Sequence, residues 1–400
     1  MVLLIVDAYF LFFSNFTLEV EREIANKLSN GDKNPVKITL KGNFSFKSDL
    51  VVIDEFPVQL QLRDKNFNCD KLEPIFKHEI KYDVEPKTRG VYQFGKIHVL
   101  VNSQFKLIQR KISYDKSQSV KVYPSFIQYK KYAFLALNDR LQEVGVKKVR
   151  RLGGATEFEQ IREYVPGDDI RRINWKATSR RQTLLMNHYE TEKSQNIYFL
   201  IDKGRMMHAP FNGMALFDYA INSALVMAGI AQGKGDKSGL ITFSNLIGSF
   251  ITANERRENI STISEALYSQ ETRLRETDFL RLYKNVRIRI KRRSLLMMFT
   301  NFESNTTLQR QLPYLKALAH HHVLVLILFE NAEVKQLAEK STSGMKNIYD
   351  QTTAEHHILE KSRIRMELSK NGIYTILTEP QNLTINTINK YLELKAKGAI

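Results

Sequence analysis

Residues 196–207, NIYFLIDKGRMM, hold an apolar run that ends at an aspartate and passes into a polar loop. A short apolar run with polar ends is typical of a buried strand, and four later runs have the same character. The other predicted strands are 238–243, 294–300, 323–329 and 373–378, and the predicted helices are 215–232, 258–268, 278–292, 308–319, 354–371 and one at the C-terminus. Strands that alternate with helices imply an open, mostly parallel sheet with helices on both faces. Residues 196–400 are therefore predicted to form a Rossmann-like α/β domain.

The N-terminal part of the chain has a different pattern. Segments such as VKITLKG (36–42), SDLVVIDEF (48–56) and GVYQFGKIHVLV (90–101) alternate apolar and polar residues, with turn residues between them. This pattern predicts a β-sandwich over residues 16–125. Residues 126–150 have helical spacing and a basic end, which predicts a connecting helix. The expected chain is thus multidomain, with the β-sandwich first and the α/β domain last.

Composition sets wide bounds on function. The chain has 400 residues, of which 43% are hydrophobic, and this length favours two or three domains. The formal net charge of +17 would suit a nucleic-acid binder, an acidic partner or anionic lipid, and composition does not separate these classes. The single cysteine, Cys69, excludes an internal disulfide framework and a multi-cysteine metal site.

The first thirteen residues, MVLLIVDAYFLFF, form an apolar run that Asp7 interrupts. The run is shorter than the roughly 20 apolar residues that a spanning helix needs, and it has no basic segment of a secretory signal. Two interpretations stay open on the residues alone. The run is either the first strand or short helix of the following domain, or the tail of a transmembrane helix.

Polar residues at the ends of the predicted strands are candidate ligands. Asp202 ends the first strand of the α/β region, Thr300 and Asn301 end a later one, and Thr277 precedes a helix. Ligand sites in open α/β sheets lie beyond the carboxyl ends of the strands, where a metal or a phosphate would bind. The alternative is that Asp202 caps a helix or forms a turn.

Residues 153–180, GGATEFEQIREYVPGDDIRRINWKATSR, concentrate charge around a Pro-Gly-Asp-Asp turn. The turn predicts a bend at Gly167, with Asp168 or Asp169 capping a helix that begins at IRRINWKATSR. On that helix Arg172, Lys176 and Arg180 have i, i+4 spacing. Trp175 is expected to pack on the α/β domain. The acids and arginines of the run are expected to pair.

Three roles remain open for this charged run. It clamps itself onto the domain, it presents a docking surface to a protein partner, or Glu157 and Asp168 serve as an acid/base pair. No nucleophile or histidine accompanies these two acids in the run. Carboxylates paired with arginines have lowered pKa values that do not suit general acid catalysis, so the acid/base role is the least favoured.

The charged run, together with IYFLIDKGRMM (197–207), RGVYQFGKIHV (89–99) and VYPSF (122–126), resembles a bacterial family known as domain of unknown function 58. The resemblance covers nearly the whole chain. It implies two N-terminal transmembrane helices, a β-sandwich, a signature segment at 151–195 and a von Willebrand factor A-like domain at 196–400. Residues 1–15 then correspond to the remnant of a transmembrane helix. The resemblance also implies an inner-membrane protein whose main body faces the cytoplasm and whose partner is a MoxR-type AAA ATPase.

The resemblance to von Willebrand factor A-like domains also implies a magnesium site. Asp202, Thr277 and Asn301 stand at its ligand positions, but Gly204 and Met206 stand where hydroxyl ligands would be. Mg²⁺ prefers hard oxygen ligands with carboxylate charge, which a thioether does not supply. The site is therefore expected to be degenerate and no cofactor is expected.

The sequence thus predicts a non-enzymatic, membrane-tethered scaffold or adapter that docks on the ATPase and an unknown client. The residues expected to form the docking surface are Glu157, Arg162, Tyr164, Gly167, Asp168, Arg171, Trp175 and Arg180. One alternative is binding of nucleic acid or anionic lipid through the basic segment RLYKNVRIRIKRR (281–293). Nucleic acid is the less favoured ligand, because no zinc spacing or aromatic platform accompanies the segment. The other alternative is a magnesium-dependent enzyme.

Overall fold

The structure is a computed structural model that describes residues 7–9, 11–12, 16–44, 47–62, 65–103, 107–137, 141–147, 157–165, 170, 173–181, 183–190, 194–254, 258–339 and 345–399. Two compact units make up the chain. The first comprises Met1–Ala133, His208–Val226 and Ile260–Thr272, and the second comprises Phe134–Met207, Met227–Asn259 and Arg273–Ile400. The first unit therefore includes two segments of the region that was predicted to be α/β.

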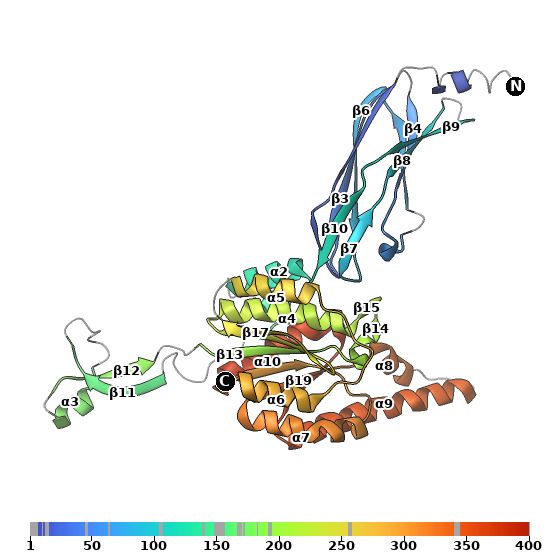
Figure 1. Ribbon diagram of the computed structural model, residues 1–400. Helices are drawn as coiled ribbons and strands as arrows, with labels where there is room; N and C mark the ends of the chain where they lie inside the picture. The colour runs from blue at the N-terminus through green and yellow to red at the C-terminus, as the bar shows by residue number, and fades with distance from the viewer. Residues whose placement is uncertain are drawn as a thin grey trace. The chain divides into compact units, whose positions relative to one another are not determined.

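The N-terminal region is β-rich and holds three sheets (Figure 1). Their strand orders are β1-β3-β6, β2-β10-β7 and β5-β4-β8-β9, and the pairs are antiparallel except for β2 with β10. In β6, Ile80, Tyr82 and Val84 are buried and the residues between them are exposed, which is the alternation that predicted strands here. The strands are β1 (Thr17–Glu23), β2 (Lys27–Ser29), β3 (Asn34–Asn43), β4 (Ser48–Asp54), β5 (Asn66–Leu72), β6 (Ile75–Val84), β7 (Gly90–Phe94), β8 (Ile97–Asn102), β9 (Gln109–Tyr114) and β10 (Gln118–Tyr123).

Part of the N-terminal apolar run packs into this β-rich region. Leu11 is fully buried in the core of the region. The buried Asp7 carboxylate accepts hydrogen bonds from the Ser103 hydroxyl and from the backbone N–H of Leu107. If the N-terminal run is a short first helix of the following domain, Leu11 is expected to be buried in that domain, as it is here. Residues 1–6, 10 and 13–15 of the run lie outside the described residues. In the part of the chain that the structure describes, no helix has the length and apolar character needed to cross a membrane.

Arg89, the first residue of the RGVYQF motif, joins three segments of the first unit. Its Nε donates to Oδ1 of Asp218 at 2.7 Å, near the start of helix α4 (Leu216–Gly233). Its Nη2 donates to the carbonyl oxygen of Gln270 at 2.8 Å, and Nη1 donates to that of Leu267. Leu267 lies in the last turn of α5 (Glu258–Tyr268), where carbonyl oxygens have no partner within the helix. The planar guanidinium thus binds a helix start and a helix end at once.

A six-stranded mixed sheet forms the centre of the second unit, in the order β17-β16-β13-β18-β19-β20 (Figure 1). The strand β17 is antiparallel to β16, and all other neighbours are parallel. The strands are β13 (Asn196–Asp202), β16 (Lys237–Phe243), β17 (Ile247–Asn254), β18 (Leu295–Phe299), β19 (Val323–Phe329) and β20 (Tyr374–Thr378). Since the second and third strands lie on one side of β13 and the last three on the other, the strand order reverses at β13.

Helices lie on both faces of this sheet. On one face, Leu200 of β13 and Met298 of β18 share a core with Val286, Leu315 and Ile364 of the helices α6, α7 and α9. The C-terminal part of α4 lies on the other face (Figure 1). Further helices of the second unit have the bounds α6 (Phe279–Arg289), α7 (Asn305–His321), α8 (Ala332–Glu339), α9 (Met345–Lys370) and α10 (Leu383–Ala396), and α2 (Phe126–Leu137) follows the β-rich region. The prediction of a β-rich region followed by an α/β region with an open, mostly parallel sheet is confirmed.

Several features of the structure differ from the predicted elements, among them the helix α8 and the strands β11 (Glu157–Glu163) and β12 (Leu185–Glu190), which were not predicted. The strand β17 was not predicted, because its sequence IGSFITAN includes Gly248, Ser249 and Asn254 and lacks a continuous apolar run. The small hairpin β14–β15 (Pro210–Phe211 and Met214–Ala215) was also not predicted. The connecting helix predicted over 126–150 is shorter, because α2 ends at Leu137 and a 3-10 turn follows at Leu141–Val144.

Candidate functional site

Asp202 lies at the carboxyl end of β13, where the strand order of the sheet reverses, and it is only 2% exposed. Its Oδ1 accepts hydrogen bonds from the Thr277 hydroxyl at 2.6 Å and from the Gly204 N–H at 2.8 Å. Its Oδ2 accepts one from the Thr300 hydroxyl at 2.7 Å. We call these four residues the Asp202 cluster. The sheet brings Asp202 and Thr300 together because β13 and β18 are parallel neighbours whose carboxyl ends meet at one edge, and Thr277 comes from the loop before α6.

The position of Gly204 has no room for a side chain. A Cβ atom at Gly204 would lie 2.1 Å from the Thr277 Oγ1 and 3.0 Å from the Asp202 Oδ1. Any larger residue would therefore displace the threonine that binds the carboxylate. The resemblance placed a missing hydroxyl ligand at this position, and in the structure the Gly204 N–H serves the carboxylate instead.

Burial raises the pKa of Asp202, and the hydrogen bonds from Thr277, Thr300 and Gly204 oppose this shift. A carboxylate in water has a pKa near 4, and removal from water disfavours the charged form. Three donors offset part of that cost, because each favours the charged carboxylate. The cluster is thus a buried acid stabilised by neutral donors.

Asn301, the third predicted metal ligand, takes a different partner. Its Oδ1 accepts a hydrogen bond from Nζ of Lys361 at 2.6 Å, and the same Nζ donates to the carbonyl oxygen of Phe302 at 2.7 Å. Lys361 is only 3% exposed and comes from α9. Burial lowers the pKa of Lys361 to about 8, and the charges of Glu303 and Glu330 oppose this shift.

The residues of this edge do not fit a magnesium ion. Both oxygens of the Asp202 carboxylate accept hydrogen bonds from neutral donors, and the amide oxygen of Asn301 is bound by an ammonium group. A cation beside Lys361 would meet like charge, and Asp202 is the only carboxylate of the predicted ligand set. Within the described ranges, no group of three or more His, Cys, Asp and Glu side chains is arranged to hold a metal ion. The structure thus brings Asp202 and Thr277 together and directs Asn301 elsewhere.

Lys361 was missed by the sequence analysis, although a signal for it exists. It lies three and seven residues before Ile364 and Leu368, so all three share one face of α9. Ile364 and Leu368 are fully buried, and a lysine on a buried helical face needs polar partners. The position of Lys361 therefore indicated a buried ammonium group in advance.

The signature segment forms a hairpin with a short helix, which we call the hairpin arm (Figure 1). Its strands β11 (Glu157–Glu163) and β12 (Leu185–Glu190) pair antiparallel, and α3 (Trp175–Arg181) lies between them in the sequence. The N–H of Tyr164 donates to the carbonyl oxygen of Leu184 at 2.8 Å and continues the pairing. The N–H of Leu185 donates to the Thr178 hydroxyl at 3.0 Å, which fastens α3 to β12.

Two predictions about this segment are wrong. The helix begins at Trp175 and not at Ile170, because the Asn174 side chain accepts a hydrogen bond from the N–H of Ala177 at 3.0 Å and so caps it. Trp175 does not pack on the α/β sheet, since it is 68% exposed.

The remaining signature residues are described to different extents. Tyr164 is half-buried in the hairpin arm, and Arg180 is exposed in the last turn of α3. The backbones of Glu157 and Arg162 lie in β11. Gly167, Asp168 and Arg171 lie outside the described residues, so the expected network of acids and arginines stays a prediction.

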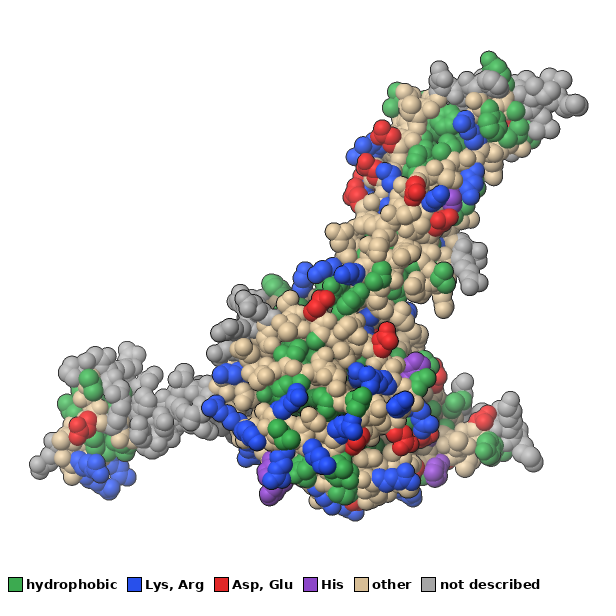
Figure 2. All heavy atoms as spheres, viewed as in Figure 1, with side chains coloured by type: hydrophobic (Ala, Val, Ile, Leu, Met, Phe, Trp, Pro, Cys, Tyr) green, Lys and Arg blue, Asp and Glu red, His purple; other side chains and the backbone are tan. Residues whose placement is uncertain are grey.

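The hairpin arm exposes apolar side chains beside basic ones. Figure 2 shows hydrophobic side chains next to a group of Lys and Arg on the arm. The exposed large apolar residues are Ile161, Val165, Ile170, Trp175 and Leu184, and the exposed basic residues of α3 are Lys176, Arg180 and Arg181. Contiguous exposed apolar residues mark interaction sites more often than scattered ones do.

These features define a class of protein: a β-rich region followed by an α/β region whose mixed sheet carries a buried acid at its carboxyl edge. The chain belongs to the family described as protein of unknown function DUF58, whose model matches residues 160–373. It is similar to the uncharacterized protein YeaD of Bacillus subtilis (strain 168), with 25% identity over 190 residues. That alignment covers 44% of this chain and 45% of YeaD, so the chain spans about half the length of this relative.

Two solved structures are similar to parts of the chain. One is the CARDB domain of the PF1109 protein from Pyrococcus furiosus, in complex with di-metal ions, with 13% identity and a TM-score of 0.18. It covers 27% of this chain and 93% of that one. The other is proximal thread matrix protein 1 from the mussel byssus with a zinc-occupied MIDAS motif, with 12% identity and a TM-score of 0.29. It covers 51% of this chain and 46% of that one.

Proposed function

We propose that the chain is a non-enzymatic adapter that docks on a MoxR-type AAA ATPase, at the cytoplasmic side of a bacterial inner membrane. In this proposal the β-rich region is a β-sandwich and the α/β region is of the von Willebrand factor A-like type. The family resemblance supports the partner and the location. A sheet order that reverses at its first strand, with an antiparallel third strand, supports the domain type.

The observation that carries the proposal is the exposure of Trp175 on the hairpin arm. Tryptophan is enriched among the residues that dominate binding energy at protein interfaces, where it is buried by the partner. The exposed apolar residues Ile170 and Leu184 belong to the same arm. The basic residues Lys176 and Arg180 of α3 favour a partner with an acidic surface at the contact.

The Asp202 cluster supports a structural role for the edge of the sheet. The carboxylate of Asp202 is saturated by Thr277, Thr300 and Gly204, and each of these donors belongs to the chain itself. A general base must reach a substrate proton, and a 2% exposed carboxylate with both oxygens engaged does not. The cluster instead fixes the ends of β13 and β18 to the loop that carries Thr277.

The test is a binding measurement between the purified full chain and a purified MoxR-type AAA ATPase from the same organism. The variant Trp175→Ala with Ile170→Ser removes two exposed apolar side chains from the arm. We expect this variant to bind roughly tenfold or more weakly, since an interface tryptophan contributes about 2 kcal/mol or more. The control is Tyr349→Ala, which removes a 72% exposed aromatic residue from α9.

The control is expected to bind as the wild type does. Equal binding by the arm variant, with its circular dichroism unchanged, would contradict the docking role of the arm. A wild-type chain that does not bind the ATPase at all would contradict the choice of partner.

A further inference from the structure

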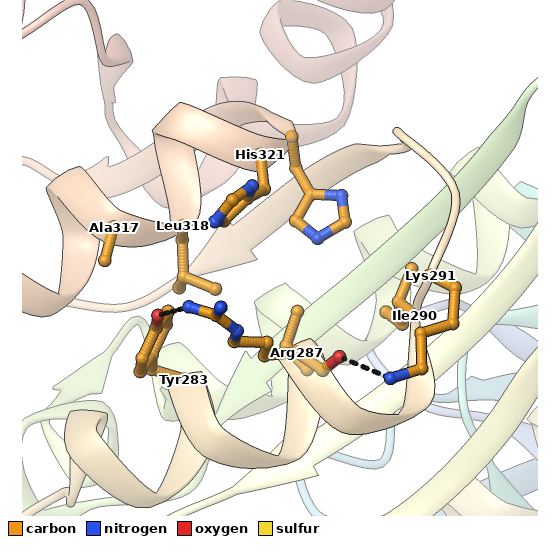
Figure 3. A pocket seen from close by; sticks show the side chains of 9 residues that line it. Tyr283, Arg287, Ile290, Lys291, Ala317, Leu318 and His321 are labelled. Carbon is orange, nitrogen blue, oxygen red and sulfur yellow. Dashed lines mark hydrogen bonds between the residues drawn. The ribbon is translucent and has the colours of Figure 1, made fainter.

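A pocket of about 270 Å³ lies between α6 and α7, on the part of the chain with the densest basic sequence. Figure 3 shows the Arg287 side chain extending toward Tyr283, below Leu318 and His321 of α7, with Lys291 on the other side of Arg287. We call this cavity the α6–α7 pocket. It is lined by Tyr283, Val286, Arg287, Ile290, Lys291, Ala317, Leu318, His321 and His322. Four of these residues carry basic side chains, and none carries an acidic one.

The charges of the pocket are not neutralised by the described part of the chain. Arg287 donates from Nη1 to the Tyr283 hydroxyl at 2.7 Å, and Lys291 donates from Nζ to the carbonyl oxygen of Arg287 at 3.4 Å. Both partners are neutral, and among the described residues neither cation forms an ion pair with a carboxylate. The two cations therefore raise the electrostatic potential in the pocket and favour an anion there.

His322 gives an independent indication of a ligand. It lines the pocket and is only 6% exposed, yet its buried Nδ1 has no hydrogen-bond partner among the described residues. A buried polar atom without a partner costs about 1–3 kcal/mol, and most such atoms in proteins are paired. Burial lowers the pKa of His322, with a further contribution from His321, so without a ligand the ring is neutral. A bound anion favours the protonated ring, in which both nitrogens donate.

We propose that the α6–α7 pocket binds a phosphate group, and that the group belongs to the headgroup of an anionic lipid. Phosphate oxygens accept hydrogen bonds from guanidinium, ammonium and imidazolium groups, which Arg287, Lys291 and His322 supply. The surface beside the pocket fits a membrane, because Ile288 of α6 is 68% exposed between basic residues. Further exposed basic residues of the same segment are Lys284, Arg289, Arg292 and Arg293. Juxtaposed basic and apolar side chains bind anionic lipid surfaces.

The experiment compares matched variants of the full chain on vesicles. Phosphatidylcholine vesicles with and without phosphatidylglycerol are sedimented with wild type, Arg287→Gln and Lys291→Gln. The controls Arg365→Gln and Lys370→Gln remove the same charges from exposed positions of α9, outside the pocket and outside the basic segment 281–293. We expect phosphatidylglycerol to retain the wild type, and each pocket variant to bind roughly tenfold more weakly, because a charge-assisted hydrogen bond is lost. The controls are expected to keep most of the binding, since neither removes a side chain of the pocket or of the basic segment.

A second experiment uses inorganic phosphate. Its binding to the wild type is measured by calorimetry, and it is added to the vesicles as a competitor. Sodium chloride of equal ionic strength is the control. Stronger displacement by phosphate than by chloride supports a phosphate site. Phosphate binding by the wild type without vesicle binding assigns the site to a soluble phosphate compound and overturns the lipid headgroup. Equal losses in pocket variants and controls overturn the pocket, because net charge alone then explains retention. Binding of neither probe overturns the proposal.

Discussion

Arg89 and Asp218 are 129 positions apart in the sequence and form an ion pair that is almost wholly buried, with Nε 2.7 Å from Oδ1. The pair joins the β-rich part of the first unit to the first turn of α4. Because Arg89 also binds the carbonyl oxygens of Leu267 and Gln270, each of the three guanidinium nitrogens donates to an acceptor. This explains physically why the RGVYQF motif begins with an arginine, since lysine lacks the planar fork that these acceptors require.

Arg89→Met is expected to lower the free energy of unfolding by about 3–5 kcal/mol, because the buried Asp218 carboxylate and two carbonyl oxygens lose their donor. Urea denaturation followed by circular dichroism measures this change. Lys87→Met serves as the control, since Lys87 is partly exposed and pairs with Glu85 at the surface. The control is expected to change the free energy by about 0.5 kcal/mol or less. Similar losses in the two variants would contradict the role of Arg89.

Gly204→Ala is expected to destabilise the chain by about 1–3 kcal/mol, because the new Cβ would lie 2.1 Å from the Thr277 Oγ1. Thr277→Ala removes the atom in conflict, so the glycine substitution should cost less in that background than alone. A double-mutant cycle from urea denaturation gives the coupling between the two positions. Strict additivity of the two changes would show that the cluster relaxes without strain.

Asp202→Asn is expected to become less destabilising, relative to wild type, as the pH rises from 4 to 8. The raised pKa of Asp202 means that its contribution to stability is present below the pKa of the unfolded chain and is lost as the pH rises through the higher folded pKa. The asparagine does not titrate, so the variant lacks this loss. Unfolding free energies of both proteins at pH 4, 6 and 8 measure the difference. A difference that is constant over this range would contradict the raised pKa.

The free energy of unfolding of the wild type is expected to rise at high pH because of Lys361, and Lys361→Met is expected to remove this rise. The pKa of Lys361 is lowered to about 8, so between pH 8 and 10.5 the unfolded chain binds more protons than the folded chain, and wild-type stability rises. The stability of wild type relative to the variant should therefore increase by roughly 1–3 kcal/mol across this window. Urea denaturation at pH 7.5 and 10 tests this. Lys284→Met, at an exposed position of α6, is the control and should show no such increase.

The sequence predicted the α/β region well where burial is complete and less well at its edges. The strand β13 has a continuous apolar run because helices cover both of its faces, and such runs are easy to recognise. The edge strand β17 has only half-buried and exposed positions, so its sequence has no comparable signal. In the hairpin arm, Trp175 is exposed although it is large and apolar. Its residue type alone therefore did not predict whether it is buried within this chain.

The candidate site was predicted in part for a similar reason. Asp202 and Thr300 come together as the strand ends indicated, since the edge of a parallel sheet is set by the topology, and Thr277 joins them as the resemblance implied. The partner of Asn301 was not predictable from strand ends, because Lys361 comes from α9, 60 residues later in the sequence. Contacts of this kind depend on how a helix lies across the sheet, which local patterns do not specify.

The arrangement of the first unit has a consequence for biosynthesis. The last strand of the β-rich region, β10, ends at Tyr123, but the first unit also needs His208–Val226 and Ile260–Thr272. During synthesis on the ribosome, Arg89 therefore lacks its hydrogen-bond acceptors on Asp218 and Leu267 until those later residues have been made. Domains generally fold N-terminal first during synthesis, and an incomplete unit leaves apolar surface uncovered in the meantime. The nascent N-terminal region is thus complete only once residue 272 has emerged, well into translation of the second unit.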